Sequence, residues 1–148
     1  MRDEIIINDI QNIQNYSELK VTKSADYKFR LKLRNQKIQT KMKFIFSTPS
    51  VESNIDIKIA LYKSECEMPV EVHIPNGVKG VSAELNIVVY VMDEKSRANI
   101  TPGMFIHDRD VQKAGHGLVI KNIKNKDLYY FYSRGIDRKL GEKLLIGF

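Results

Sequence analysis

Apolar and polar residues alternate along five stretches in the first two thirds of the chain. The stretches are residues 29–33, 44–46, 55–61, 70–74 and 85–91, and each has an apolar residue at every second position. Strands that bury one face show this period, because successive side chains point to opposite sides of a sheet. The pattern therefore predicts a chain that is mostly β.

Turn-forming residues interrupt the alternation at intervals of roughly 14 residues. They lie at residues 47–50, 68–69, 75–77 and 101–103. This spacing suits either a β-sandwich with long strands or the coils of a β-solenoid, and periodicity does not choose between them. No internal repeat or low-complexity linker occurs, which favours a single domain over residues 1–148.

The clearest helix signal lies near Phe148. Asp137 is a typical N-cap residue, leucines at positions 140, 144 and 145 recur at helical spacing, and Gly147 follows them. We therefore expect a short terminal helix within residues 137–148 that covers an edge of the β body. Residues 6–13 are ambiguous, since their isoleucines fit a helical stripe while nearby asparagines weaken it.

Composition limits the class of protein. The 148 residues are 43% hydrophobic, which is enough for one domain with a buried core. No long apolar run like that of a signal peptide or membrane helix occurs near the N-terminus, so we expect a cytoplasmic protein without a membrane partner. Cys66 is the single cysteine, which excludes an internal disulfide and a cysteine-rich metal site.

Positive charge is in excess, with a formal net charge of +6 and a pI near 9.3. Part of this charge, on Lys28, Arg30, Lys32 and Arg34, alternates with apolar residues. We interpret these side chains as the solvated face of a half-buried strand. The alternative is a nucleic-acid-binding surface, because a basic stripe near aromatic residues can contact phosphates and bases.

Three histidines have the greatest potential for metal or acid–base chemistry. His73 alternates with apolar residues, which predicts an exposed strand position, and His107 precedes Asp108, whose carboxylate could orient it. His116 has a glycine on each side, which allows close approach of another chain or a ligand. Taken alone, His116 is best explained as a turn residue, because it has no carboxylate or thiolate at ligand spacing.

Sequence motifs of catalysis are missing from the chain. It contains no G-x-S-x-G, no G-x-x-x-x-G-K, no H-E-x-x-H and no C-x-x-C, so we expect that it is not an enzyme. The four aromatic residues at positions 129–132 would alternate between two faces if they formed a strand. At least one pair of them would then belong to the core or to an interface.

Six short pieces of the last third occur together in a fixed order. They are PGMFI at 102–106, DV at 110–111, HG at 116–117, LYY at 128–130, SRGI at 133–136 and LLIGF at 144–148. As a set they resemble the core-domain signature of the SUF-system scaffold family, SufB and SufD. The resemblance covers residues 98–148, and the preceding part shows compatible β patterning.

The resemblance implies an all-β fold, a right-handed parallel β-helix (β-solenoid) with a short C-terminal helix. It implies a non-enzymatic scaffold or accessory subunit of iron–sulfur cluster assembly, partnered as a homo- or hetero-oligomer by an ABC-type ATPase subunit, a SufB-like scaffold subunit, or both. His116 is implied as a contact for iron or a transient iron–sulfur cluster. Terminal strands that pair two subunits are implied to contain Tyr129, Tyr130, Phe131, Tyr132 and Arg134.

The chain departs from the family pattern at three points. No cysteine lies close before His116, which indicates that the chain is either SufD-like or degenerate. One extra residue lies between Val111 and His116, which indicates either a β-bulge or a site that has drifted. The sequence stops at Phe148, where family members continue into helices that grip the ATPase, so we expect that contact to be impaired. Dimerisation would cover exposed end coils of a short solenoid.

Overall fold

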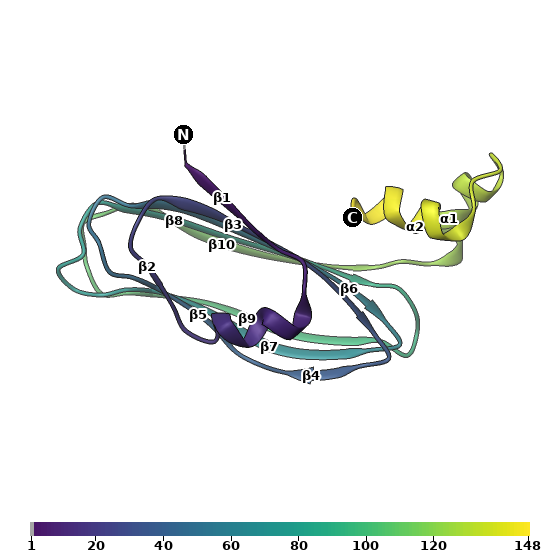
Figure 1. The fold of residues 1–148 in the computed structure, drawn as a ribbon, viewed down its shortest axis with the longest axis horizontal. Helices are drawn as coiled ribbons and strands as arrows, with labels where there is room; N and C mark the ends of the chain where they lie inside the picture. Colours follow the sequence, from purple (N-terminus) through teal and green to yellow (C-terminus); the bar gives the residue numbers. More distant parts are fainter. Residues whose placement is uncertain (1) are drawn as a thin grey trace.

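The computed structural model describes residues 2–148, apart from the side chains of residues 10, 12 and 14. Its strands form two parallel sheets that face each other as the two sides of a flattened β-solenoid (Figure 1). Sheet A contains, in spatial order, β1 (Asp3–Ile7), β3 (Ala25–Arg34), β6 (Glu52–Tyr62), β8 (Val81–Val91) and β10 (Val111–Asn122). Sheet B contains β2 (Leu19–Val21), β5 (Met42–Phe46), β7 (Glu65–Ile74) and β4 (Lys37–Gln39), with β9 (Arg97–Ile106) paired to β7.

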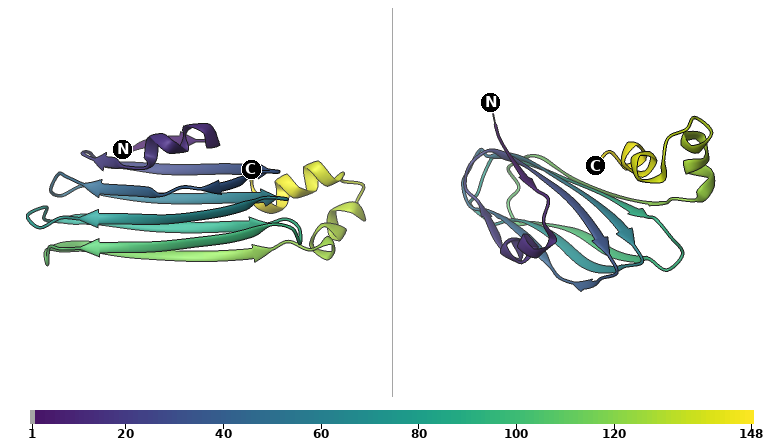
Figure 2. Two further views of the ribbon diagram at one scale, coloured as in Figure 1. Left: turned by 90° about the horizontal axis from the view of Figure 1, so that it is seen from below. Right: turned by 45° about the vertical axis from the view of Figure 1, so that its right-hand side comes forward.

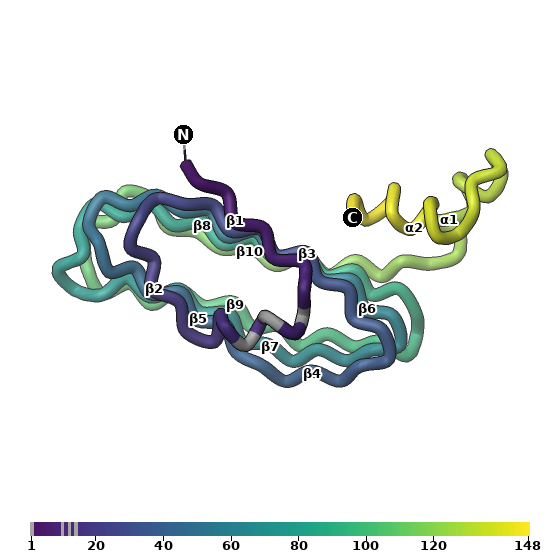
Figure 3. The backbone as a smooth tube through the Cα atoms, viewed as in Figure 1, coloured from purple at the N-terminus to yellow at the C-terminus, as the bar shows by residue number. Residues whose placement is uncertain are grey.

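The chain alternates between the two sheets, so each coil contains one long segment of each (Figure 3). Tyr27 pairs with Ile55 and Ile55 pairs with Leu85, so successive coils advance the sequence by 28 and then 30 residues. This repeat is about twice the spacing of the turn-forming pieces. The sandwich alternative is therefore wrong and the solenoid is confirmed. The pieces at 47–50 and 75–77 do connect strands, whereas 68–69 and 101–103 lie inside β7 and β9, so their prediction as turns is wrong.

Parallel register stacks side chains of like character into columns. Phe29 pairs with Ile57, which pairs with Ile87, and all three side chains are buried. Paired residues of a parallel sheet point to the same side, so the apolar half of each alternating stretch fills the interior between the sheets. The five stretches predicted as strands all lie in strands of this core.

One end of the solenoid is covered by the chain itself. After β1, the 3₁₀ helix η1 (Ile10–Tyr16) packs on this end, with the Tyr16 ring edge-on to Phe29 at 5.1 Å between ring centroids. Ile13 is buried in the same contact region. The ambiguous N-terminal stretch is thus a strand followed by a 3₁₀ helix, while the side chain of Ile10 lies outside the described part. Figure 2 shows η1 at the purple end of the stacked coils.

Two helices follow β10, namely α1 (Asn125–Tyr132) and α2 (Arg138–Ile146). The predicted caps of the second are confirmed, since the Asp137 carboxylate accepts a hydrogen bond from the Leu140 amide at 2.8 Å and Gly147 is left-handed. The prediction that this helix covers a strand edge is wrong. Instead α2 packs on the outer face of sheet A, where Ile146 contacts a small apolar cluster (Figure 1). No helix within residues 2–148 is long and apolar enough to cross a membrane.

Candidate functional site

The end of the solenoid opposite η1 is bare. In the part of the chain that the structure describes, β10 pairs with β8 alone and β9 pairs with β7 alone. Figure 2 shows these green strands as the last layer of the stack, with no element beyond them. We call this surface, formed by β9, β10 and their inward-facing side chains, the open end.

Register identifies the side chains that line the open end. In β10 they are residues 114, 116, 118 and 120, which pair with buried positions of β8, and in β9 they are the even-numbered residues 98–106. Ile106 and Ile120 are 43% and 44% exposed, although the preceding residues of their columns, Ile74 and Val89, are fully buried. The open end is therefore a cross-section through the apolar interior.

His116 lies inside this cross-section. It occupies the middle of β10 and pairs with Leu85, an inward-facing core residue, so its side chain belongs to the interior column. His116 is nevertheless exposed, because no further coil covers it. The interpretation as a turn residue is wrong.

A β-bulge sets this register. Val111 pairs with Val81 and Lys113 with Ser82, so Gln112 is the additional residue. A slip of one residue moves a side chain to the opposite face of a sheet, and the bulge absorbs the insertion before it reaches His116. Of the two explanations for the extra residue, the bulge is confirmed.

The glycines beside His116 leave two successive outward positions of β10 without side chains. A Cβ atom added at Gly115 would meet nothing within 4 Å, and one at Gly117 would meet only the Asn86 Oδ1 atom at 3.6 Å. Both glycines lie outside the group with positive φ. The folded chain does not itself require glycine at these positions, which leaves them free for the close approach of a second molecule.

Further metal ligands are not gathered around His116. Among the described residues, no group of three or more His, Cys, Asp or Glu side chains could hold a metal ion. Cys66 points into the interior from sheet B, and burial raises the pKa of its thiol to about 11.

Comparison with known proteins places this geometry in a family. The model of the SUF system FeS cluster assembly, SufBD core domain, matches residues 11–147. The chain belongs to the SufBD core-domain family. The similarity noted in residues 98–148 thus extends over nearly the whole chain.

A curated relative is the iron-sulfur cluster assembly protein SufD of Bacillus subtilis (strain 168). It is 34% identical to this chain over 73 residues, which are 49% of this chain and 16% of that protein. The SufBD-family chain described here therefore matches a small part of that relative.

The aromatic run of this SufBD-family chain lies in a helix. Tyr129, Tyr130, Phe131 and Tyr132 belong to α1, and Arg134 lies in the turn after it, so their predicted placement in terminal strands is wrong. The Asp127 carboxylate accepts a hydrogen bond from the Lys124 amide at 2.7 Å, which closes the first turn of α1. The terminal strands are β9 and β10.

The aromatic side chains of α1 are nonetheless accessible. Tyr129 and Tyr130 are 71% and 58% exposed, and the Arg134 guanidinium stacks 3.7 Å from the centre of the Tyr130 ring. Phe131 instead faces Gly141 of α2, where a Cβ atom would approach its side chain to 3.3 Å. Their assignment to a subunit interface stays a prediction.

Two cations of the basic stripe of β3 form ion pairs, and the other two lie against aromatic rings. Lys28 lies 2.9 Å from Glu4, Arg30 lies 2.8 Å from Asp56, and the Arg34 guanidinium stacks 4.0 Å from the centre of the Tyr62 ring. Lys32 is 5.3 Å from the centre of the Phe148 ring. These contacts fit the interpretation of β3 as a solvated face and do not favour a nucleic-acid surface.

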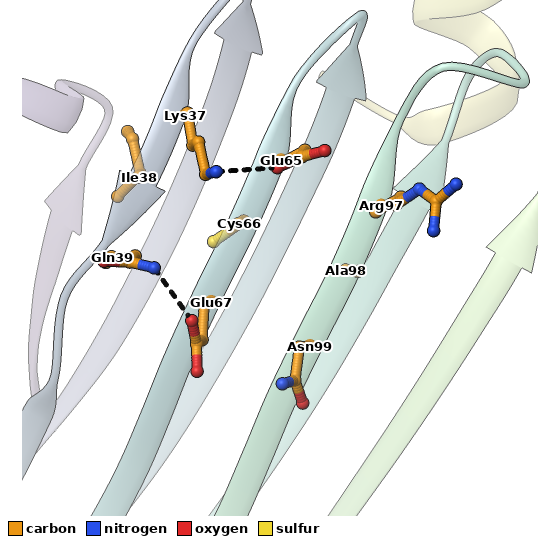
Figure 4. A pocket seen from close by; sticks show the side chains of 9 residues that line it. All are labelled: Lys37, Ile38, Gln39, Glu65, Cys66, Glu67, Arg97, Ala98 and Asn99. Atoms are coloured by element: carbon orange, nitrogen blue, oxygen red, sulfur yellow. Dashed lines mark hydrogen bonds and ion pairs between the residues drawn. The ribbon is translucent and has the colours of Figure 1, made fainter.

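A hollow of about 290 Å³ spans β4, β7 and β9 on sheet B (Figure 4). Its polar side chains are partly paired: Lys37 lies 3.6 Å from Glu65, and the Gln39 amide donates to Glu67 at 3.1 Å. Pairing across neighbouring strands is a structural role, and we assign this hollow no function.

The other two histidines lie away from the open-end interior. His73 is on the outer face of sheet B as expected, but it is half-buried, stacked on Phe105 at 4.6 Å between ring centroids. His107 is exposed just after β9. The Asp108 carboxylate accepts hydrogen bonds from the Gly77 and Asp110 amides at 2.8 and 2.9 Å, which gives it a role in fixing the β9–β10 turn.

Asp108 should make the fold sensitive to acid. The Asp110 and Gly77 amides lower the pKa of its carboxyl, so the ionised form stabilises the folded state at pH values above the unfolded pKa of about 3.9. That contribution is lost as the pH falls through the lower folded pKa. Asp108→Asn should therefore lower the free energy of unfolding at pH 7, as measured by urea denaturation. In strong acid the free energies of unfolding of the variant and the wild type should become more similar. A pH-independent difference, or the same profile for the exposed control Glu94→Gln, would contradict this role.

Proposed function

We propose that this SufBD-family chain is a non-enzymatic scaffold or accessory subunit of SUF-type iron–sulfur cluster assembly that pairs with a second scaffold-type subunit through the open end. The observation that carries the proposal is the asymmetry of the solenoid. Its own η1 covers one end, whereas the other presents His116 among apolar side chains. A solenoid end needs a cap or a partner, because a bare coil exposes interior side chains.

The apolar side chains and the free strand edge of the open end both suit contact with a second subunit. Its apolar rows, including Ile106 and Ile120, lose exposed area when another surface covers them, which favours association. The free edge of β10 also carries unpaired backbone N–H and C=O groups that another strand can bond. The partner is either a second copy of the chain or a SufB-like subunit.

His116 then lies at the junction of two subunits. Imidazole nitrogen is a common ligand of iron, and iron–sulfur clusters need several protein ligands, usually thiolates. The described residues contain no group of three or more His, Cys, Asp or Glu side chains that could hold a metal ion, so in this proposal the remaining ligands come from the partner. In this proposal iron and sulfide are the cargo of the assembly, and His116 contributes one contact to it.

The α1–α2 hairpin is the proposed contact for an ABC-type ATPase subunit. Tyr129 and Tyr130 on α1 and Leu140 and Leu144 on α2 are all exposed. Exposed aromatic and leucine side chains on two packed helices form a surface suited to a protein partner. The expectation that contact with the ATPase is impaired stays a prediction, and α1 and α2 offer a helical surface on which it can be tested.

Anaerobic reconstitution with iron and sulfide tests the metal-binding part of the proposal. The wild type, paired with a SufB-like subunit, should develop cluster absorption that His116→Ala reduces severalfold, since one ligand is lost. His107→Ala is the matched control, because His107 is exposed outside the interior column. Equal spectra for all three proteins would remove His116 from the site and leave a purely structural oligomer.

A further inference from the structure

A groove of about 700 Å³ lies where α2 passes over the turns that connect the sheets. Four cations line it, Arg34, Lys63, Arg138 and Lys139, against the two carboxylates of Asp93 and Glu142. They come from the end of β3, the β6–β7 turn, the β8–β9 turn and α2. The volume is within the range of small-molecule sites, about 300–1,000 Å³.

Both carboxylates are already engaged. Asp93 Oδ2 accepts a hydrogen bond from the Lys63 amide at 2.7 Å, and Asp93 Oδ1 accepts from the Lys95 amide and the Ser96 hydroxyl, each at 3.0 Å. Glu142 accepts from the Arg138 Nε atom at 2.9 Å. Asp93 therefore holds turn backbone, and Glu142 neutralises the cation of its own helix.

The other three cations of the groove keep their charges available. Within residues 2–148, no carboxylate forms an ion pair with Arg34, Lys63 or Lys139. The Arg34 guanidinium stacks on the Tyr62 ring at 4.0 Å, which orients the group while its N–H edge can still bind an anion.

Positive charge extends beyond the rim of the groove. Burial lowers the pKa of the neighbouring Lys32 ammonium, the charges of Arg34, Lys143 and Lys139 lower it further, and the charge of Glu142 partly opposes this shift. Cations near enough to oppose one another's ionisation create a positive potential that attracts anions.

Lys63 has a backbone conformation that does not favour lysine. Its φ is +48°, in the left-handed region that asparagine and glycine adopt more readily than lysine. One coil earlier the corresponding residue is Asn35, with a φ of +52°. The backbone conformation at residue 63 therefore does not explain the choice of lysine, and Lys63 is one of the residues that line the groove.

We propose that this groove binds a small oligophosphate anion, either free or as the phosphate chain of a nucleotide. Arg34 would contact phosphate oxygens through two N–H groups, and Lys63 and Lys139 would bind as point charges from different sides. Cations spread over several elements match a chain of phosphates better than a single anion. The inference does not depend on pairing through the open end.

Isothermal titration calorimetry at low salt, with tripolyphosphate in one series and ATP in another, tests the groove. Both should bind with 1:1 stoichiometry, and affinity should fall steeply as salt rises. Equal affinities would show recognition of the phosphate chain alone, and tighter binding of ATP would show that the base adds contacts. Either result supports the proposal, whereas no saturable binding of either compound would overturn it.

Two variants locate the binding. Lys63→Asn suits the left-handed backbone, so it should fold at least as stably as wild type while weakening tripolyphosphate binding about tenfold. Lys139→Gln should weaken it similarly, and Lys126→Gln on α1, outside the groove, is the control. If Lys63→Asn and Lys139→Gln bind as tightly as the control, the anion does not occupy this groove.

Discussion

Replacing Ile120 by aspartate is expected to abolish pairing through the open end, whereas the same change at the neighbouring Val119 should leave pairing nearly intact. The two side chains are similarly exposed, 44% for Ile120 and 49% for Val119. Their directions differ, because Ile120 pairs with the inward-facing Val89 and Val119 with the outward-facing Val88. Ile120→Asp therefore places a carboxylate in the apolar contact and Val119→Asp does not.

The expected loss of affinity is at least about 100-fold, which corresponds to about 2.7 kcal/mol for a charge buried without a partner. Sedimentation velocity of each variant, alone and mixed with a SufB-like subunit, measures it. Circular dichroism must first show that both variants fold. We expect that they do, because the side chains of residues 119 and 120 are exposed in the isolated chain. Equal association of the two variants would show that the open end is not the contact surface.

Replacing Phe44 by alanine is expected to cost about 3–5 kcal/mol of the free energy of unfolding. Phe44 is fully buried in β5, and its ring centroid lies 5.9 Å from that of Tyr27 and 6.0 Å from that of Phe29. Its removal leaves a cavity in the coil that η1 covers. Since domains are typically stable by about 5–15 kcal/mol, this loss is a large share of the total free energy of unfolding.

Urea denaturation followed by circular dichroism measures this loss. Phe105→Ala is the matched control, because Phe105 stacks on His73 on the outer face of sheet B and is exposed. Its loss should stay below about 1 kcal/mol. Similar midpoints for both variants would show that the interior aromatic cluster does not carry the stability assigned to it.

The strands were predictable from sequence because burial on one face imposes a period of two. Residues 55–61 show this clearly, with Ile55, Ile57, Ile59 and Leu61 inside the solenoid. That period says nothing about which strand lies beside which, so a sandwich and a solenoid remained equal until the family resemblance favoured the solenoid. The helix ending at Gly147 was predictable because its cap residues act locally.

The features that sequence reasoning missed depend on longer-range contacts. Four consecutive aromatic residues at 129–132 fit a strand as well as a helix, and the signal that was overlooked is Asp127, three residues after Lys124 at the start of α1. His116 was identifiable as a residue of interest, but its direction depends on the bulge at Gln112. Likewise, the pairing of Arg30 with Asp56 joins neighbouring coils and could not be read from either segment alone.

The central claim is that the open end is a subunit interface, and hydrogen exchange of β10 tests it most directly. In the isolated chain, about half of the β10 amides point away from β8 and have no strand to bond. Pairing should slow exchange in Lys113–Ile120 when wild type is mixed with a SufB-like subunit or concentrated, and Ile120→Asp should reverse the effect. Equally fast exchange in β10 with and without partner, under conditions where a complex forms, would contradict the account.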